Sequence, residues 1–461
     1  MKRNADIGLF SKPSNLKYFT FSRILSLRLL KCHNLSGKQS LMTPFDQSIS
    51  PTLTPPSLPG AASQPQPIGW WTPCQGDPIF ISQNEIKIAL YRLRDPLFVT
   101  SQAGKPQFHT TGTAVMGCIA PPSTDALPLL AWVPALPPES LGDPDFKKFY
   151  GIRYAYVAGA MAGGITSVEM VCEVVNAGML GFFGAAGLSI SEIDQAIHAI
   201  RQRVGDRTFG CNFIHSPNEP QHEMAVAQLY IDREVRLVSA SAFLNLSLPI
   251  VYYRVKGIHQ LPDGSIVCPN RIKAKVSRAE VARRFFSPPP AKLVHQLLER
   301  NLITRQEAEL SAHIPMADDL TAEADSGGHT DNRPAITLLP SMIALRDQVC
   351  SEYRYARLPR VGLGGGISNP RSAAGAFAMG AAYILVGSVH QSCVESGSSD
   401  AVRKLLADAQ QADVAMAPSA DMFEMGVKVQ VLKRGTMFAL RANRLYDLYQ
   451  AHDRYEDIPA N

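Results

Sequence analysis

The stretch Gly362-Leu363-Gly364-Gly365-Gly366-Ile367 ends an apolar run that begins at Arg360 and leads into a helix-like segment at Pro370. Glycines have no Cβ, so backbone N–H groups can approach a phosphate, and the N-terminus of a following helix favours a negative charge. A second loop of this kind, Val386-Gly387-Ser388, ends the next apolar run. The candidate phosphate ligands are therefore Gly365, Gly366, Gly387 and Ser388, and the alternative is that both loops are tight structural turns.

Around this stretch, short apolar runs alternate with longer amphipathic segments over residues 151–411. Eight such units favour an α/β fold with a closed (β/α)8 TIM barrel over an open doubly wound sheet. The two glycine loops then follow strands seven and eight, where barrels commonly bind phosphate. Neither loop has the spacing of a Rossmann or Walker motif. The predicted strands are Tyr154–Ala158, Leu180–Phe183, Thr208–Phe213, Leu237–Ala240, Ile272–Val276, Asp319–Ala324, Arg360–Leu363 and Tyr383–Val386. The predicted helices are Ser167–Ala177, Ile190–Val204, Glu219–Ile231, Arg278–Phe285, Pro340–Tyr353 and Pro370–Met379.

The segments outside the barrel differ in composition. Residues 1–68 form a basic, Pro-rich tail, because residues 1–41 hold eight Lys or Arg against one acid and residues 51–67 hold six prolines. Residues 1–41 fit either an unstructured tail, with Met42 as an alternative start, or an amphipathic, transit-like segment. Residues 69–150 are predicted to form a small β-rich domain, with strands at Pro78–Ile81, Leu97–Thr100, Thr113–Ile119 and Leu129–Val133. Residues 412–461 are predicted to form a helical extension.

Two insertions, after strands four and five, interrupt the barrel. Residues Arg254–Pro269 contain the turn Leu261-Pro262-Asp263-Gly264 between β-like runs, which predicts a hairpin. Residues Ser287–Pro315 are predicted to form a helical hairpin from Ala291–Arg300 and Thr304–Ala312. We expect the second insertion (287–315) to act as a lid over the site.

The candidate chemistry follows strand six, in Asp325-Ser326-Gly327-Gly328-His329. Barrel enzymes place their sites at the carboxyl ends of the strands, so Gly327 and Gly328 would hold His329 at the barrel mouth against a flat cofactor. Histidine titrates near neutrality and suits proton transfer, so His329 is the candidate catalytic residue. The alternative is a structural histidine.

Three further strand ends carry candidate cofactor contacts. Gly159, Ala160 and Met161 lie in a small-residue loop on which a ring system could pack, or which could serve barrel packing alone. The amide of Asn212 can donate and accept hydrogen bonds, as a flavin pyrimidine edge requires, although an ordinary turn would also suit it. Lys275 interrupts an apolar strand, so its ammonium group must reach an anion or water. The side chain either points to the cofactor site or points to the protein surface.

The amino-acid composition excludes several classes of protein. The net charge of +5 comes from residues 1–41, which carry +7, so the remainder carries −2 and does not suggest nucleic-acid binding. No uncharged apolar run reaches the roughly 18 residues of a membrane helix. The eight cysteines form no C-x-x-C pair, which indicates reduced thiols in a cytoplasmic protein and no zinc or other metal site.

These motifs resemble, over about residues 155–395, the nitronate monooxygenase (2-nitropropane dioxygenase) superfamily, which also contains FMN-dependent bacterial enoyl reductases. One branch is more similar still: the PfaD family, the trans-acting enoyl reductases of polyunsaturated fatty acid and polyketide synthases. The segments that carry this second resemblance are Gly69–Trp71, Gly112–Met116, Tyr154–Gly164, Lys273–Arg278 and Met422–Leu448.

The resemblance implies FMN and NADPH as cofactors and a 2-enoyl thioester on an acyl carrier protein as substrate. Carried over, Gly159, Ala160 and Met161 pack on the isoalloxazine, Asn212 and Lys275 meet its polar edge, and the two glycine loops hold the phosphate. His329 takes the position of the superfamily's site histidine. The chain departs from the monooxygenase pattern at Ala160, where proline is frequent, and in its two insertions.

Two other functions stay open on the sequence. One is a nitronate monooxygenase-like FMN oxidase that uses His329 as a base, and the other is a non-catalytic scaffold barrel of a synthase complex. No residue distinguishes NADPH from NADH. The chain length of the substrate and the oligomeric state, a homodimer included, are not encoded in a recognisable motif.

Overall fold

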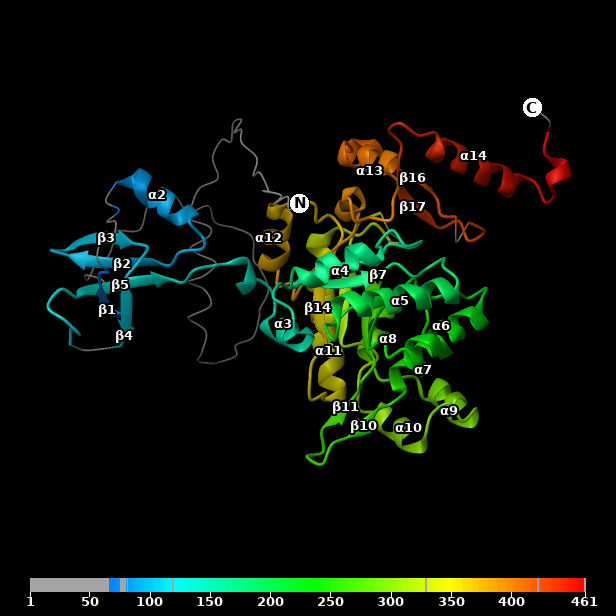
Figure 1. Cartoon of the computed structure of the whole chain (residues 1–461), viewed down its shortest axis with the longest axis horizontal. Coiled ribbons are helices and arrows are strands. Elements are labelled where there is room, and N and C mark those ends of the chain that lie inside the picture. The colour runs from blue at the N-terminus through cyan, green and yellow to red at the C-terminus, as the bar shows by residue number, and fades with distance from the viewer. Residues whose placement is uncertain are drawn as a thin grey trace, which may run out of the picture. The chain divides into compact units, whose positions relative to one another are not determined.

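The computed structural model describes residues 66–74, 80, 82–117, 120–327, 330–420 and 423–459. Eight parallel strands close into a barrel, in which the last strand pairs with the first through Val386 and Ala158 (Figure 1). The predicted TIM barrel is confirmed, with all eight strands in their predicted places. The strands are β6 (Tyr156–Ala158), β7 (Leu180–Phe183), β8 (Gly210–Ile214), β9 (Leu237–Ser241), β12 (Arg271–Val276), β13 (Asp319–Glu323), β14 (Arg360–Gly364) and β15 (Ile384–Val386).

Helices connect the strands and cover the barrel. Local sequence defines their ends: α5 begins with a capping box between Ser189 and Glu192, and α12 begins at Pro370 with Asn369 as its N-cap. All six predicted helices are confirmed. They are α4 (Val168–Asn176), α5 (Ile190–Val204), α6 (Pro220–Asp232), α8 (Ala279–Phe286), α11 (Ala335–Tyr353) and α12 (Pro370–Ala378).

Two details of the helices differ from the prediction. Helix α7 (Leu248–Val255) was not predicted, because residues 249–255 are all buried and therefore show no amphipathic period. Helix α11 begins at Ala335 rather than Pro340, so Pro340 lies inside the helix. As the sixth residue of α11, Pro340 has no N–H to donate to the carbonyl oxygen of Ile336, so the sequence pattern favoured a helix that begins at this proline.

An antiparallel sheet precedes the barrel, with strand order β3-β2-β5-β1-β4. Its core contains Trp71, Phe98 and Leu129, and Trp71 stacks on His109 at 3.8 Å between ring centroids. Strands were predicted at three of these five positions, and β1 and β3 were not predicted. Most of the predicted strand 78–81 lies outside the described residues. The elements are β1 (Gly69–Thr72), α2 (Gln83–Tyr91), β2 (Leu97–Gln102), β3 (Lys105–His109), β4 (Thr113–Met116) and β5 (Leu127–Val133).

The two insertions form the predicted hairpins but lie at the amino ends of the barrel strands. They contain β10 (His259–Gln260) with β11 (Ile266–Val267), and α9 (Ala291–Glu299) with α10 (Arg305–Ser311). Helix α8 returns the chain from the carboxyl end of β12 to the amino ends, and insertion 287–315 follows it and leads directly into β13. The prediction that this insertion forms a lid over the site is therefore wrong, and α9 and α10 lie with β10 and β11 at the same end of the barrel (Figure 1).

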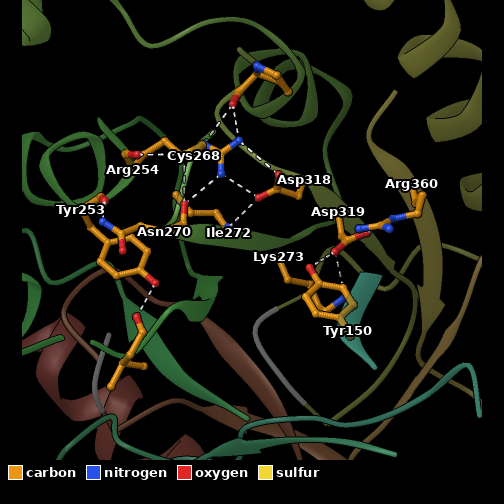
Figure 2. Close-up of polar contacts among 12 residues, drawn as sticks. Tyr150, Tyr253, Arg254, Cys268, Asn270, Ile272, Lys273, Asp318, Asp319 and Arg360 are labelled. Carbon is orange, nitrogen blue, oxygen red and sulfur yellow. Dashed lines mark hydrogen bonds and ion pairs between the residues drawn. The ribbon is translucent and has the colours of Figure 1, made fainter. Parts of the chain in front are cut away.

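A buried arginine ties both insertions to this end of the barrel (Figure 2). Arg254 is 1% exposed and donates to the carboxylate of Asp318 at 2.6 Å. It also donates to the carbonyl oxygens of Asn270 and Pro315, each at 2.9 Å. A buried guanidinium needs such a full set of acceptors, so this cluster fixes the insertions as structural parts.

The amino end of the barrel is closed by helix α3 (Pro144–Tyr150). Lys273 lies 3.5 Å from Asp319, which also accepts from Arg360 at 2.6 Å and from the hydroxyl of Tyr150 (Figure 2). Burial lowers the pKa of Lys273 to about 7, against the opposing attraction of Asp319. The ammonium nitrogen also lies 3.6 Å from the centre of the Tyr383 ring. This end of the barrel is therefore a closed polar and aromatic plug.

The chain after the barrel forms α13 (Asp400–Ala407), the hairpin of β16 (Val414–Pro418) and β17 (Lys428–Leu432), and α14 (Phe438–Ala451). The C-terminal helix was predicted, whereas the β16–β17 hairpin was not. No helix in the described part of the chain is long and apolar enough to span a membrane.

Candidate functional site

The loop after β14 has a backbone that only glycine accommodates well. Gly365 has φ +92°, and a Cβ there would lie 2.6 Å from the carbonyl oxygen of Ala324 at the end of β13. Gly366 has φ +69°, and a Cβ there would meet nothing within 4 Å. Gly365 thus permits the close approach of two strand ends, while Gly366 leaves open space in front of the N-terminus of α12.

The loops after three strands, β6, β13 and β15, meet beside the Gly365-Gly366 loop. Gly159, after β6, donates its backbone N–H to the carbonyl oxygen of Val386 at 2.9 Å. A Cβ on Gly387 would lie 3.9 Å from the sulfur of Met161, and a Cβ on Gly327 would lie 3.4 Å from Oγ of Ser388. The structure therefore brings together five of the predicted site residues from the loops after β6, β13 and β15.

The small-residue loop after β6 is fixed by residues that the sequence analysis missed. The hydroxyl of Thr166 accepts from the N–H of Met161 at 2.9 Å and donates to the carbonyl oxygen of Gly159 at 2.7 Å. Gly184 permits the loop to lie against β7, because a Cβ there would be 1.8 Å from the carbonyl oxygen of Met161. Ala160 packs against the aromatic and aliphatic cluster inside the barrel.

Lys275 points to a partner at the carboxyl end of the barrel. Its ammonium lies 2.8 Å from the carboxylate of Glu323, and both side chains are largely buried. Glu323 ends β13 and was not predicted as a site residue, because the sequence does not show which lysine a strand-end carboxylate meets. The other polar candidate, Asn212, is buried and accepts from the hydroxyl of Ser241 at 3.2 Å.

The loop after β13 is anchored at both ends. At its start, Oδ1 of Asp325 accepts from Nδ2 of Asn332 and from Nε2 of Gln430 on β17, each at 2.6 Å. At its end, Asp331 accepts from Arg278 and from Ser277, each at 2.8 Å, and the Arg278 hydrogen bond holds the pKa of Asp331 below its usual value. Gly328 and His329 lie outside the described residues, within this anchored loop.

A second histidine lies beside the phosphate loop. His390 belongs to the short 3-10 helix Ser388–Ser392, and its Nε2 lies 2.8 Å from the hydroxyl of Tyr156 on β6. Burial lowers the pKa of His390, which keeps the imidazole neutral near pH 7. The pair ties the segment after Ser388 to the first strand. Nothing in the sequence marks His390 as a partner of Tyr156, which lies far away along the chain.

A further polar cluster follows β8 and is built around a buried carboxylate. Glu223 accepts from Nδ1 of His215 and from the N–H of Ser216, each at 3.0 Å, and from the hydroxyl of Ser247. His215 also stacks on Phe243, with 5.0 Å between the ring centroids.

Among the described residues there is no group of three or more His, Cys, Asp or Glu side chains that could hold a metal ion.

Comparison with known proteins gives a consistent set of relatives. The nitronate monooxygenase family model matches residues 144–441. The chain is 47% identical over 323 residues to polyketide biosynthesis protein PksE of Bacillus subtilis (strain 168), covering 70% of this chain and 42% of PksE. It is 40% identical over 401 residues to a polyunsaturated fatty acid synthase subunit of Thraustochytrium sp., covering 86% of this chain and 26% of the synthase protein.

Among solved structures, the enoyl reductase domain of MlnA, from the macrolactin biosynthesis cluster of Bacillus amyloliquefaciens, is 42% identical to the chain with a TM-score of 0.68. The alignment covers 70% of this chain and 73% of that one. The chain thus spans less than half of PksE and of the Thraustochytrium synthase protein, but most of an isolated enoyl reductase domain.

Proposed function

Because the chain belongs to the nitronate monooxygenase family, we propose that it is an FMN-dependent enoyl reductase that acts in trans. Its substrate would be a 2-enoyl thioester on an acyl carrier protein during polyunsaturated fatty acid or polyketide biosynthesis, in the cytoplasm. The observation that supports this best is the convergence of the three loops after β6, β13 and β15 beside the open position at Gly366, in a chain 42% identical to an enoyl reductase domain.

The residues present fit FMN. Gly365, Gly366, Gly387 and the hydroxyl of Ser388 would bind the phosphate, with the N-terminus of α12 favouring its charge. Gly159, Ala160 and Met161 would form the wall for the isoalloxazine, on a loop held by Thr166. Bound FMN would supply hydride transfer from NADPH to Cβ of the enoyl thioester.

The polar residues at the barrel mouth have separate proposed roles. Lys275 would place a positive charge at the electron-rich edge of the flavin, where Asn212 would donate and accept hydrogen bonds. Glu323 would orient Lys275 through their 2.8 Å ion pair. His329 would polarise the thioester carbonyl or relay the proton to Cα, with Gly327 and Gly328 giving the substrate access to it. The overall balance is one hydride from NADPH and one proton added across the double bond.

The test is an anaerobic visible spectrum of the purified protein. A yellow protein that bleaches with NADPH and recolours with a crotonyl thioester would establish the proposal. A yellow protein that bleaches slowly, or recolours only with oxygen, would instead favour the alternative of a nitronate monooxygenase-like FMN oxidase. A colourless protein that FMN cannot reconstitute would leave only the scaffold function.

A further inference from the structure

Helix α14 presents an exposed apolar surface in the C-terminal part of the chain. Leu440 is 65% exposed, Leu445 57%, Phe438 50% and Tyr449 48%. Four large apolar side chains on a helix of 14 residues are more than isolated surface exposure, and such patches commonly mark interaction sites.

The opposite side of α14 is already held by the β16–β17 hairpin. Ala439 is buried, Nδ2 of Asn443 donates to the carbonyl oxygen of Met416 at 3.1 Å, and Tyr446 packs edge-on against Phe423 with 5.3 Å between the ring centroids. Tyr449 also packs against Phe423, with 5.5 Å between the ring centroids, so it borders the side that meets the hairpin. The helix therefore has a fixed orientation, and Phe438, Leu440 and Leu445 form its exposed apolar face.

The exposed face is basic as well as apolar. Arg441 and Arg444 are exposed between the apolar side chains, and neither forms an ion pair with any side chain in the described part of the chain. On α14 itself these two arginines stand against one acid, Asp447, and Lys428 and Lys433 add two positive charges in the segment that leads to the helix. This contrasts with the chain after residue 41, whose net charge is −2. The surface fits a partner with an acidic face and an apolar centre.

The same hairpin reaches the candidate site. Strand β16 contacts α14 and pairs with β17, where Met416 lies opposite Gln430. Gln430 donates at 2.6 Å to Asp325, the residue that begins the loop containing His329. The basic, apolar face is thus carried by an element that contacts the loop at the barrel mouth.

We infer that the exposed face of α14, comprising Phe438, Leu440, Arg441, Arg444 and Leu445, is the docking surface for the acidic acyl carrier protein that delivers the substrate. The inference rests on the proposed function, because it names the partner of that site. A second copy of this chain is less well matched, since the face would meet its own positive charge in a symmetric contact. An anionic membrane is the remaining alternative and is resolved by the test.

The experiment compares two substrates on the full chain loaded with FMN. One is a crotonyl thioester on a carrier-protein domain from a polyunsaturated fatty acid synthase, and the other is crotonyl-N-acetylcysteamine, which has no protein part. Arg441→Glu/Arg444→Glu should raise KM for the carrier-bound substrate on the order of tenfold and leave the small thioester unaffected. Arg300→Glu/Arg305→Glu is the matched control, because it makes the same charge change on exposed arginines at the amino end of the barrel.

Equal KM values for the carrier-bound substrate in the wild type and the Arg441→Glu/Arg444→Glu variant would overturn the inference, as would an equal rise in the control. If that variant loses FMN or folds poorly, Leu440→Ser/Leu445→Ser tests the same face by removing its apolar centre. If the wild type reduces neither thioester, the proposed function fails, and anisotropy of the labelled carrier domain still tests the surface. If the wild type is an oligomer in solution and the Arg441→Glu/Arg444→Glu variant is a monomer, the face is a self-association surface. If the wild type binds phosphatidylserine vesicles and does not bind the carrier domain, the face is a membrane-binding surface.

Discussion

The paired glycines at 365 and 366 permit a sharp test of the phosphate loop, because both have left-handed backbones and differ only in the space around them. An alanine at either position pays about 1 kcal/mol for a positive φ. At Gly365, the Cβ would also meet the carbonyl oxygen of Ala324 at 2.6 Å and that of Asp325 at 2.8 Å. Both are backbone atoms of the β13 end, so the loop must move, which typically costs a further 1–3 kcal/mol.

Gly365→Ala should therefore cost about 2–4 kcal/mol in total, divided between folding and cofactor affinity. If about half is lost from FMN binding, Kd rises about five- to thirtyfold. Gly366→Ala, with nothing within 4 Å of its Cβ, should change Kd by no more than about fivefold. FMN affinity is measured from the quenching of FMN fluorescence on binding to the apoprotein. Thermal unfolding of each variant then gives the part of the free-energy cost that appears as lost stability.

Equal FMN affinity and equal thermal stability in the two variants would refute this reasoning. That result would mean that the β13 and β14 ends separate without cost. A loss confined to Gly366→Ala would place the ligand directly over that residue, and the close approach at Gly365 would then be structural only.

Three further predictions concern titrating groups. His329→Ala should lower enoyl reduction about 10²- to 10⁴-fold while the flavin spectrum persists, and turnover at the parent rate would remove His329 from the mechanism. The pKa of Lys273 is about 7 in the folded chain and 10.5 in the unfolded chain, so the unfolded chain binds more protons between these two values. The free energy of unfolding of the wild type should therefore rise with pH in this range. Lys273→Met should reduce this rise, as measured by urea unfolding at pH 7 and pH 9.5. The pKa of His390 is lowered from 6.5, so stability should fall as pH drops below 6.5, and His390→Gln, compared by thermal scans at pH 5 and pH 7, should lose this dependence.

The sequence predicted the barrel well because each strand is a short apolar run bounded by loop residues. Strands buried on both faces keep this signal, and so do helices with one apolar side such as α5, whose predicted bounds are those observed. Helix α7 lacked the signal because it is buried all round. Strands β1 (GWWT) and β3 (KPQFH) were missed because each has no more than two apolar side chains. A local sequence pattern fails where a helix is buried on all sides or where a strand has few apolar side chains.

The candidate site was predicted in part for a related reason. Glycines such as Gly365 are visible in the sequence because their role is a local backbone conformation. Glu323, Thr166 and His390 were missed because each acts through a partner on another strand or loop. Such pairings depend on barrel closure and register, which are settled only when the eight strands are placed together.

The position of insertion 287–315 shows how one helix decides which end of a barrel a segment occupies. The segment lies between strands five and six in the sequence, which suggested a place near the site. Helix α8 comes before it, and therefore the chain has already returned to the amino ends, where Met316 donates its N–H to the carbonyl oxygen of Ser287 at 2.9 Å. In contrast, the β16–β17 hairpin follows the last strand of the barrel and contacts Asp325 at the carboxyl end. Shortening insertion 287–315 should thus lower stability more than it changes substrate selection. Substitutions in the β16–β17 hairpin should change substrate selection more than stability.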